Sequence, residues 1–247
     1  MAQFKDHFST QSGTYAEFRP VYPAGLFRFL SSLFSGHEFC WDVATGNGQA
    51  AATLAEFFSH VYATDASANQ IAEAKPHPRI SYYVEGAEKT ALKDQSCDLI
   101  AVAPAIHWFR HDAFYAEVRR VLKPGGILAI WGYGLHTVSP EVDHIVEDFY
   151  SRIVGPYWPP ERRYIEQKYA GLPFPFAEIT APAFEISAQY SLSQLKGYLQ
   201  SWSATQRYIK EHGNNPLNEI QSALKAAWGA QQVRTLRWPI YTKIARV

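Results

Sequence analysis

The residues with the clearest chemical potential lie in the segment 41–51, WDVATGNGQAA. A predicted strand ends near Val43, a glycine-containing turn follows, and a predicted helix begins near Gly48. Gly46 and Gly48 allow the backbone to turn tightly and to approach a ligand closely, and the amide N–H groups at the helix start point into the same crevice. Asp65 ends the next predicted strand, where its carboxylate can hydrogen-bond a ribose diol. The pattern therefore predicts a site for a ligand that contains a nucleoside.

Two classes of nucleoside ligand fit this segment. Residues 46–51 satisfy the G-x-G-x-x-G/A fingerprint of dinucleotide-binding proteins, and Asp65 follows at about the expected spacing. Asp42, however, ends the strand just before the glycine loop, residues 44–48, and we expect its carboxylate to face the crevice. There it would repel a pyrophosphate and attract the ammonium or sulfonium of S-adenosylmethionine. The charge favours S-adenosylmethionine, while an NAD(P)-dependent oxidoreductase and a glycine turn without a ligand remain alternatives.

The elements that must hold these residues alternate between short apolar runs and helical patterns from about residue 38 to 134. One helical pattern covers 48–58, and another covers 111–122 and stops at the turn Lys123-Pro124-Gly125-Gly126. Apolar strands separated by helices indicate a mostly parallel sheet covered on both faces, hence a doubly wound, Rossmann-like α/β fold. The predicted strands are 38–44, 60–65, 80–86, 97–103 and 126–133, followed by a strand at 184–191, helices near 192–211 and 216–228, and a terminal strand at 235–247.

After residue 134 the alternation breaks. Residues 135–182 hold a helical stretch at 141–153 and then a proline-rich aromatic segment, and a long insertion of this kind is typical of a cap or a binding loop. We therefore predict a single domain over 1–247, made of an N-terminal lid segment (1–36), a cofactor-binding core (37–134), a helical and aromatic cap insertion (135–182) and C-terminal strands and helices (183–247).

The amino-acid composition argues against several classes of binding partner. The 247-residue chain has a formal net charge of zero, which argues against a nucleic-acid partner. No apolar run approaches the ~20 residues of a membrane span, and the N-terminus lacks the apolar core of a signal peptide. We therefore expect a cytoplasmic protein with no membrane partner. Cys40 and Cys97 are expected to be buried free thiols, and two cysteines alone cannot make a zinc site.

With these motifs in place, the chain resembles the class I S-adenosylmethionine-dependent methyltransferases that carry a methyltransferase type 11 domain. The resemblance covers about residues 10–135 well and rests on four segments in order: Asp42–Gly48, Asp65, Gly86-Ala87-Glu88 and Lys123–Gly126. It implies the sheet order 3-2-1-4-5-7-6 with strand seven antiparallel, and S-adenosylmethionine as the methyl donor with S-adenosylhomocysteine as the product. It implies cofactor contacts at Asp42, Ala44, Gly46, Gly48, Asp65, Ala66, Ala87, Glu88 and Ala103.

One position departs from the family pattern, because the first glycine of the usual loop is Ala44 here. A left-handed backbone disfavours a residue that carries a Cβ atom. We therefore expect Ala44 to keep a negative φ, which would place the loop slightly further from the donor.

More narrowly, the chain is similar to the trans-aconitate methyltransferase-like branch, through YAEFRPVYP at 15–23, AIHWF at 105–109 and SWSAT at 201–205. This similarity implies that the N-terminal segment folds over the donor, with Tyr15 and Arg19 near the donor's carboxylate. The planar fork of an arginine suits that role. Core packing for Tyr15 and a structural ion pair for Arg19 remain alternatives. The similarity also favours a carboxylate oxygen as the methyl acceptor.

His107 and Trp108 follow the fourth predicted strand, at the sheet edge where ligands bind in such folds. In catalysis, His107 would be a base or a hydrogen-bond donor to the acceptor, and Trp108 would pack on the adenine or wall the methyl site. A helix-start histidine and a core tryptophan are equally compatible with the sequence. A carboxylate acceptor needs no base, whereas a hydroxyl or an amine benefits from one. Further pocket candidates by position are Trp131, Tyr133, Trp158, Arg162, Arg163, Tyr164 and Trp202.

We therefore predict an enzyme that transfers a methyl group from S-adenosylmethionine to a small-molecule acceptor, as a monomer or a weak dimer. No cluster of Asp, Glu and His residues suggests a metal ion. The alternatives are an NAD(P)-dependent oxidoreductase and a catalytically silent S-adenosylmethionine-binding protein, and a protein acceptor also stays open.

Overall fold

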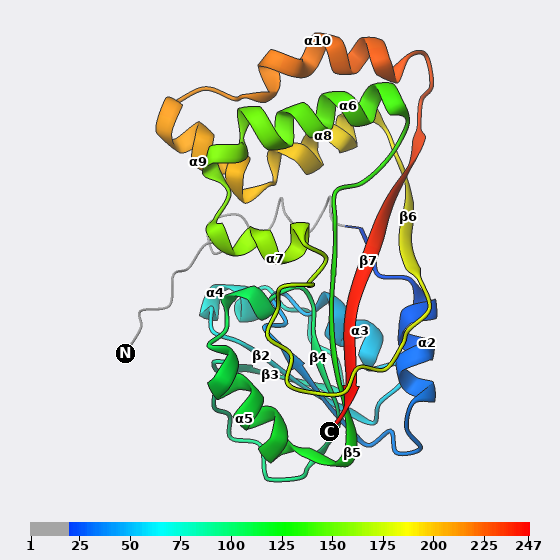
Figure 1. Ribbon diagram of the computed structural model, residues 1–247, viewed down its shortest axis with the longest axis vertical. Coiled ribbons are helices and arrows are strands. Elements are labelled where there is room, and N and C mark those ends of the chain that lie inside the picture. Colours follow the sequence, from blue (N-terminus) through cyan, green and yellow to red (C-terminus); the bar gives the residue numbers. More distant parts are fainter. Residues whose placement is uncertain (1–19) are drawn as a thin grey trace.

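The computed structural model describes residues 20–247, and its centre is a seven-stranded sheet in the order β3-β2-β1-β4-β5-β7-β6 (Figure 1). The first five strands run parallel, and β7 is antiparallel to both of its neighbours. The predicted doubly wound α/β fold and its strand order are confirmed. The strands are β1 (Phe39–Val43), β2 (His60–Asp65), β3 (Ile80–Val84), β4 (Cys97–Val102), β5 (Leu122–Tyr133), β6 (Phe184–Tyr190) and β7 (Arg234–Arg246).

Side chains that alternate along the strands fill two cores, one on each face of the sheet. On one face, Leu99 of β4 belongs to the core that includes helices α2 (Ala24–Ser32) and α3 (Gln49–Leu54). On the other face, its neighbour Ile100 belongs to the core that includes α5 (His111–Val121). Because the central strands are covered on both faces, they read in the sequence as continuous apolar runs rather than as an alternating pattern.

The segment Lys123–Gly126 is not a turn that precedes β5, as predicted, but an irregular part of that strand. The pairing of β5 with β4 skips from Leu122 to Ile127, so the residues between them bulge out of the ladder. Gly125 has a φ of +78° within the bulge, a conformation that glycine adopts without a Cβ penalty. The bulge is anchored to the end of the chain, because the Gly125 N–H donates to the Val247 carbonyl oxygen at 2.8 Å.

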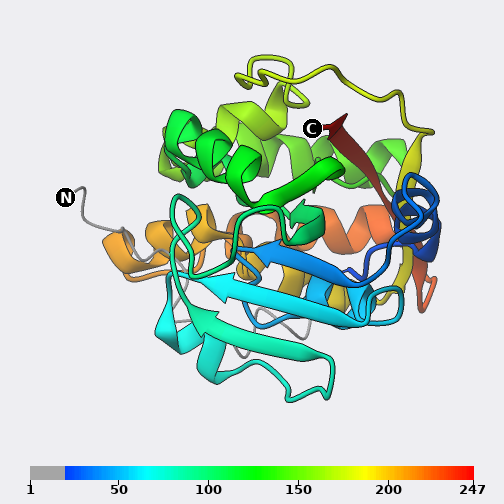
Figure 2. The ribbon, with the colours of Figure 1, turned by 90° about the horizontal axis from the view of Figure 1, so that it is seen from below.

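A helical layer lies beyond the carboxyl ends of the parallel strands (Figures 1 and 2). The predicted helix over 141–153 is α6 followed by a π-helical turn at Phe149–Ile153, and the predicted helix over 192–211 is divided into α8 and α9. Within this layer, the short helix α7 lies nearest to the sheet in Figure 1. The elements of the layer are α6 (Pro140–Asp148), α7 (Arg163–Glu166), α8 (Leu192–Gln200), α9 (Ser203–His212) and α10 (Leu217–Trp228).

The two cysteines are buried free thiols, as predicted for Cys40 and Cys97. Every helix within residues 20–247 falls short of the length and apolar character that a membrane span requires.

Candidate active site

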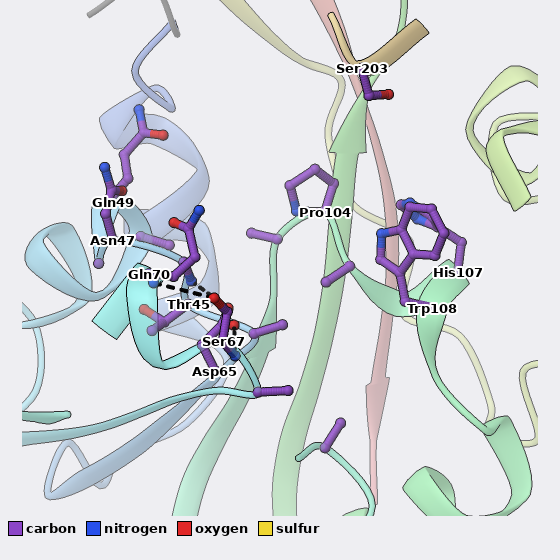
Figure 3. Close-up of a pocket in the computed structure, with 18 of the residues that line it drawn as sticks. Thr45, Asn47, Gln49, Asp65, Ser67, Gln70, Pro104, His107, Trp108 and Ser203 are labelled. Carbon is purple, nitrogen blue, oxygen red and sulfur yellow. Dashed lines mark hydrogen bonds between the residues drawn. The ribbon is translucent and has the colours of Figure 1, made fainter. Parts of the chain in front are cut away.

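The loops after the parallel strands and the inner side of the helical layer line an open cavity of about 1990 Å³. A pocket for one small molecule usually measures ~300–1,000 Å³, so this cavity has room for two. We call the walls formed by the loops after β1, β2 and β3 the donor side, and those formed by the loop after β4 and the helical layer the acceptor side. Figure 3 shows Thr45, Asp65, Ser67 and Gln70 on the first, and Pro104, His107 and Trp108 on the second.

The glycine loop contains three residues in the left-handed region. Ala44, Gly46 and Gly48 have φ values of +52°, +60° and +89°. The expectation that Ala44 keeps a negative φ is therefore wrong. Two backbone hydrogen bonds hold the turn, because the Thr45 N–H donates to the Thr64 carbonyl oxygen (2.9 Å) and the Gly48 N–H donates to the Thr45 carbonyl oxygen (3.0 Å). Ala44 consequently carries a strain of roughly 1 kcal/mol that a glycine would not.

Asp65 ends β2 and holds the glycine loop through its carboxylate. One carboxylate oxygen accepts a hydrogen bond from the Gly46 N–H at 2.9 Å, and the other accepts one from the Ser67 N–H at 2.8 Å. Each oxygen of a carboxylate can accept a second hydrogen bond, and Asp65 lines the cavity. The same side chain can therefore fix the loop and receive the hydroxyls of a ribose.

Asp42 lies beneath the glycine loop, because only 1% of its surface is exposed and it is absent from the cavity wall. Its carboxylate accepts hydrogen bonds from the Thr45 hydroxyl, at 2.5 Å, and from the Ala51 backbone. Burial raises the pKa of Asp42 to about 7 and the nearby Asp65 carboxylate also raises it, while the two hydrogen bonds lower it. The expectation that Asp42 faces the crevice is therefore wrong, and any influence on a ligand acts through the loop.

The other predicted cofactor contacts lie on or near the donor side. Ala66 follows β2, Ala87 and Glu88 follow β3, and Ala103 follows β4, and all four line the cavity together with Ala44, Gly46, Gly48 and Asp65. A carboxylate oxygen of Glu88 accepts a hydrogen bond from the Arg110 N–H at 3.0 Å. This bond ties the loop after β3 to the start of α5.

His107 and Trp108 lie in the 3₁₀ turn Ile106–Trp108 after β4, and both line the acceptor side (Figure 3). His107 is buried, and its Nδ1 atom has no hydrogen-bond partner among residues 20–247. Burial, with smaller contributions from Arg162 and His111, lowers the pKa of His107 to about 3. The imidazole of His107 is therefore neutral at physiological pH.

Aromatic residues and an arginine complete the acceptor side. Among the further pocket candidates, the structure brings Tyr133, Trp158, Arg162 and Trp202 into the cavity wall. Trp131 lies in the core, and neither Arg163 nor Tyr164 lines the cavity.

Several lining residues were missed by sequence reasoning. Ser67 accepts a hydrogen bond from the Gln70 N–H at 3.4 Å and so caps helix α4 (Ala68–Ala72). The Ser-x-x-Gln spacing is a known helix-start signal and could have revealed both residues. Tyr82 of β3 and Tyr198 of α8 also line the cavity. An aromatic residue in an amphipathic element gives no such signal, because it fits a core and a cavity wall equally well.

Tyr15 and Arg19 lie outside the residues that the structure describes. Within residues 20–247, no group of three or more His, Cys, Asp or Glu side chains is arranged to hold a metal ion.

Comparisons with known proteins agree with this site. The methyltransferase domain family matches residues 41–130. A protein from Dictyostelium discoideum, described provisionally as a methyltransferase, is 32% identical over 99% of this chain and 96% of its own length. A solved structure from Anaeromyxobacter dehalogenans, described provisionally as a type II methyltransferase, is 43% identical, covers 92% of this chain and 97% of its own, and superposes with a TM-score of 0.87.

A fourth similarity concerns the cofactor. A protein from Saccharomyces cerevisiae, described as a probable S-adenosylmethionine-dependent methyltransferase, is 23% identical over 83% of each chain. The relatives therefore decide the choice that the glycine loop left open, and the cofactor is S-adenosylmethionine rather than NAD(P). The fold, the glycine loop and the full-length relatives together show that this chain belongs to the class I S-adenosylmethionine-dependent methyltransferases.

Proposed function

We propose that the protein transfers the methyl group of S-adenosylmethionine to a carboxylate oxygen of a small-molecule acceptor. The oxygen forms a bond to the methyl carbon while the bond between that carbon and the sulfonium sulfur breaks. The products are S-adenosylhomocysteine and a neutral methyl ester, and the step moves no proton. The aromatic residues that line the acceptor side and the zero net charge support a small molecule over a nucleic acid.

The burial of His107, whose Nδ1 atom has no hydrogen-bond partner within residues 20–247 to stabilise a protonated ring, is the observation that carries the choice of a carboxylate. An effective general base has a pKa near the working pH, whereas burial lowers that of His107 to about 3. A carboxylate is already ionised at neutral pH and needs no base. In this proposal His107 stays neutral and hydrogen-bonds the acceptor, and Trp108 walls the site of methyl transfer.

On the donor side, we assign the ribose hydroxyls to Asp65, the adenine to the loop that holds Ala87 and Glu88, and the methionine part to the glycine loop. The shared cavity wall supports this assignment. Similarity to the trans-aconitate methyltransferase-like branch adds Tyr15 and Arg19, which would close over the donor's carboxylate. Residues 1–36 would then act as a lid and residues 135–182 as a cap over the acceptor.

The first experiment is calorimetric titration with S-adenosylhomocysteine, with NAD and NADP in parallel. An acceptor screen should then compare small carboxylic acids with phenols and amines by release of S-adenosylhomocysteine. Turnover on a carboxylic acid, with a product that mild alkali cleaves back to the acid, would support the proposal. Turnover on phenols or amines alone would overturn it, and tight binding without turnover on any acceptor would favour a silent binding protein.

We also propose a cytoplasmic protein that is a monomer or a weak dimer. Light scattering over a range of protein concentrations tests the oligomeric state, and a stable higher oligomer would contradict it.

A further inference from the structure

Arg162 has an unusual environment on the acceptor side of the cavity. Its guanidinium carbon lies 4.7 Å from the ring centre of Trp158 and 5.7 Å from that of Tyr150. Its Nε–H donates to the Tyr150 hydroxyl at 3.0 Å, and that hydroxyl donates to a Glu166 carboxylate oxygen at 2.6 Å. The chain from Glu166 through Tyr150 therefore fixes the direction of the guanidinium.

Within residues 20–247, the two terminal nitrogens of Arg162 have no hydrogen-bond partner. No carboxylate within residues 20–247 lies within 4.0 Å of this guanidinium, and only its Nε makes a hydrogen bond there. Arg162 is partly buried and lines the cavity. A charge in such a place is costly unless a counter-charge or hydrogen bonds satisfy it. Because Arg162 lines the cavity, a ligand bound there can supply that counter-charge.

Tyr198 offers a second hydrogen-bond donor to the cavity. It is 6% exposed and lines the cavity. Its hydroxyl oxygen accepts a hydrogen bond from the indole N–H of Trp238, at 3.1 Å. The hydroxyl also carries a proton to donate, and no residue in the described part of the chain accepts it. Ring contacts connect Tyr198 to Arg162. The ring of Tyr198 lies 5.8 Å from that of Trp202, which lies 5.7 Å from the ring of Trp158, over which the Arg162 guanidinium lies.

We infer that Arg162 and Tyr198 form an anion-binding subsite for the carboxylate of the acceptor, and that the rest of the acceptor is flat and apolar. The planar fork of an arginine matches the two oxygens of a carboxylate. The flat apolar body is inferred from the aromatic wall, since Trp158 and Trp202 lie 5.7 Å apart between ring centres and both face the cavity. Tyr150 and Glu166 are positioning residues in this arrangement. The inference rests on the proposed function and names its class of acceptor.

A carboxylate held in this way can still react. Each carboxylate oxygen has two lone pairs, so an oxygen that accepts a hydrogen bond from Arg162 keeps one for the methyl carbon. The bound carboxylate and the methylated carboxylate can therefore be the same group.

The test compares two probes of the same shape, benzoate and benzamide, titrated into the full-length protein saturated with S-adenosylhomocysteine. Ligand-observed NMR gives both dissociation constants. We expect benzoate to bind about tenfold or more tightly than benzamide, as a charge-assisted hydrogen bond predicts. Arg162→Gln should remove this preference, and Tyr198→Phe should weaken benzoate binding by about fivefold. Arg162→Lys keeps the charge but loses the fork, so its effect should be intermediate.

The neighbouring arginine provides a matched control. Arg163 is exposed and does not line the cavity, so Arg163→Gln should bind both probes as the wild type does. S-adenosylhomocysteine affinity serves as the check that each variant is folded. Equal binding of benzoate and benzamide to the wild type, no binding of benzoate at millimolar concentrations, or a preference that survives in Arg162→Gln would each overturn the inference.

The two proposals fail in different ways. If benzoate binds through Arg162 but no carboxylic acid is methylated, the subsite stands and the proposed reaction is wrong. If a carboxylic acid is methylated and Arg162→Gln leaves its KM unchanged, the reaction stands and the subsite is wrong.

Discussion

Replacement of Asp65 by alanine tests the donor side most directly. The change removes the carboxylate that accepts hydrogen bonds from the Gly46 N–H, at 2.9 Å, and from the Ser67 N–H, at 2.8 Å. It also removes the proposed hydrogen-bond acceptor for the ribose hydroxyls. Hydrogen bonds to a charged group contribute about 1.5–3 kcal/mol each. Loss of the ribose contact alone should therefore weaken S-adenosylhomocysteine binding by about 10- to 150-fold. Asp65 is partly exposed, so water can replace part of the loop bonds, and the free energy of unfolding should fall by only about 1–2 kcal/mol.

Calorimetric titration with S-adenosylhomocysteine gives the affinity, and thermal unfolding without ligand gives the stability. The matched control is Asp94→Ala, because Asp94 is exposed, pairs with Arg120 at 2.7 Å and does not line the cavity. The Asp94→Ala protein should bind S-adenosylhomocysteine with the affinity of the wild type. An Asp65→Ala protein that loses stability but keeps its affinity within about twofold would refute the assignment, because Asp65 would then hold only the loop. An equal loss of affinity in Asp94→Ala would refute it as well.

Three further predictions concern the loop, a buried acid and the histidine. Ala44→Gly should raise the free energy of unfolding by up to about 1 kcal/mol, because it relieves the left-handed strain at φ +52°; a lower melting temperature would contradict this. Burial raises the pKa of Asp42 from 3.8 to about 7. Between these pH values the native state holds a proton on Asp42 that the unfolded state has lost, so the free energy of unfolding falls as the pH rises through that range. Asp42→Asn should therefore gain stability relative to the wild type from about pH 4 to 7, and parallel melting curves over that range would argue against it. His107→Gln should lower kcat on a carboxylic acid by less than about tenfold, and a loss of 10²–10⁴ would instead indicate a general base.

The fold was largely predictable because its signals are local. The apolar runs of β2 and β4 are short, continuous and bounded by turn residues, and they differ from the predicted ranges by at most one residue. The order of the strands came from family resemblance rather than from the pattern itself. The break between α8 and α9 was missed, because no glycine or proline marks it, and Ser201 and Trp202 are compatible with a continuous helix. There, packing of the helical layer determines where the helix ends.

The donor side was predictable for a similar reason. Gly46, Gly48 and Asp65 come from two consecutive strand ends, and parallel strands bring their carboxyl ends to one edge of the sheet. Two details of this side were wrong. Asp42 does not face the cavity, because its hydrogen bond to Thr45 turns the carboxylate under the loop. Ala44 is left-handed although it carries a Cβ, because the backbone bonds of the surrounding turn outweigh a strain of roughly 1 kcal/mol.

The sequence by itself determined an α/β fold with a nucleoside site, because a glycine loop between a strand and a helix, with a carboxylate on the next strand, needs only short-range chain geometry to form one. Only the tertiary structure decided which later residues face the cavity. Arg162 and Arg163 are adjacent in the sequence, yet one lines the cavity and the other is exposed. That difference depends on how a short turn packs between the rest of the helical layer and the sheet, where Arg162 contacts Tyr150 and Trp158.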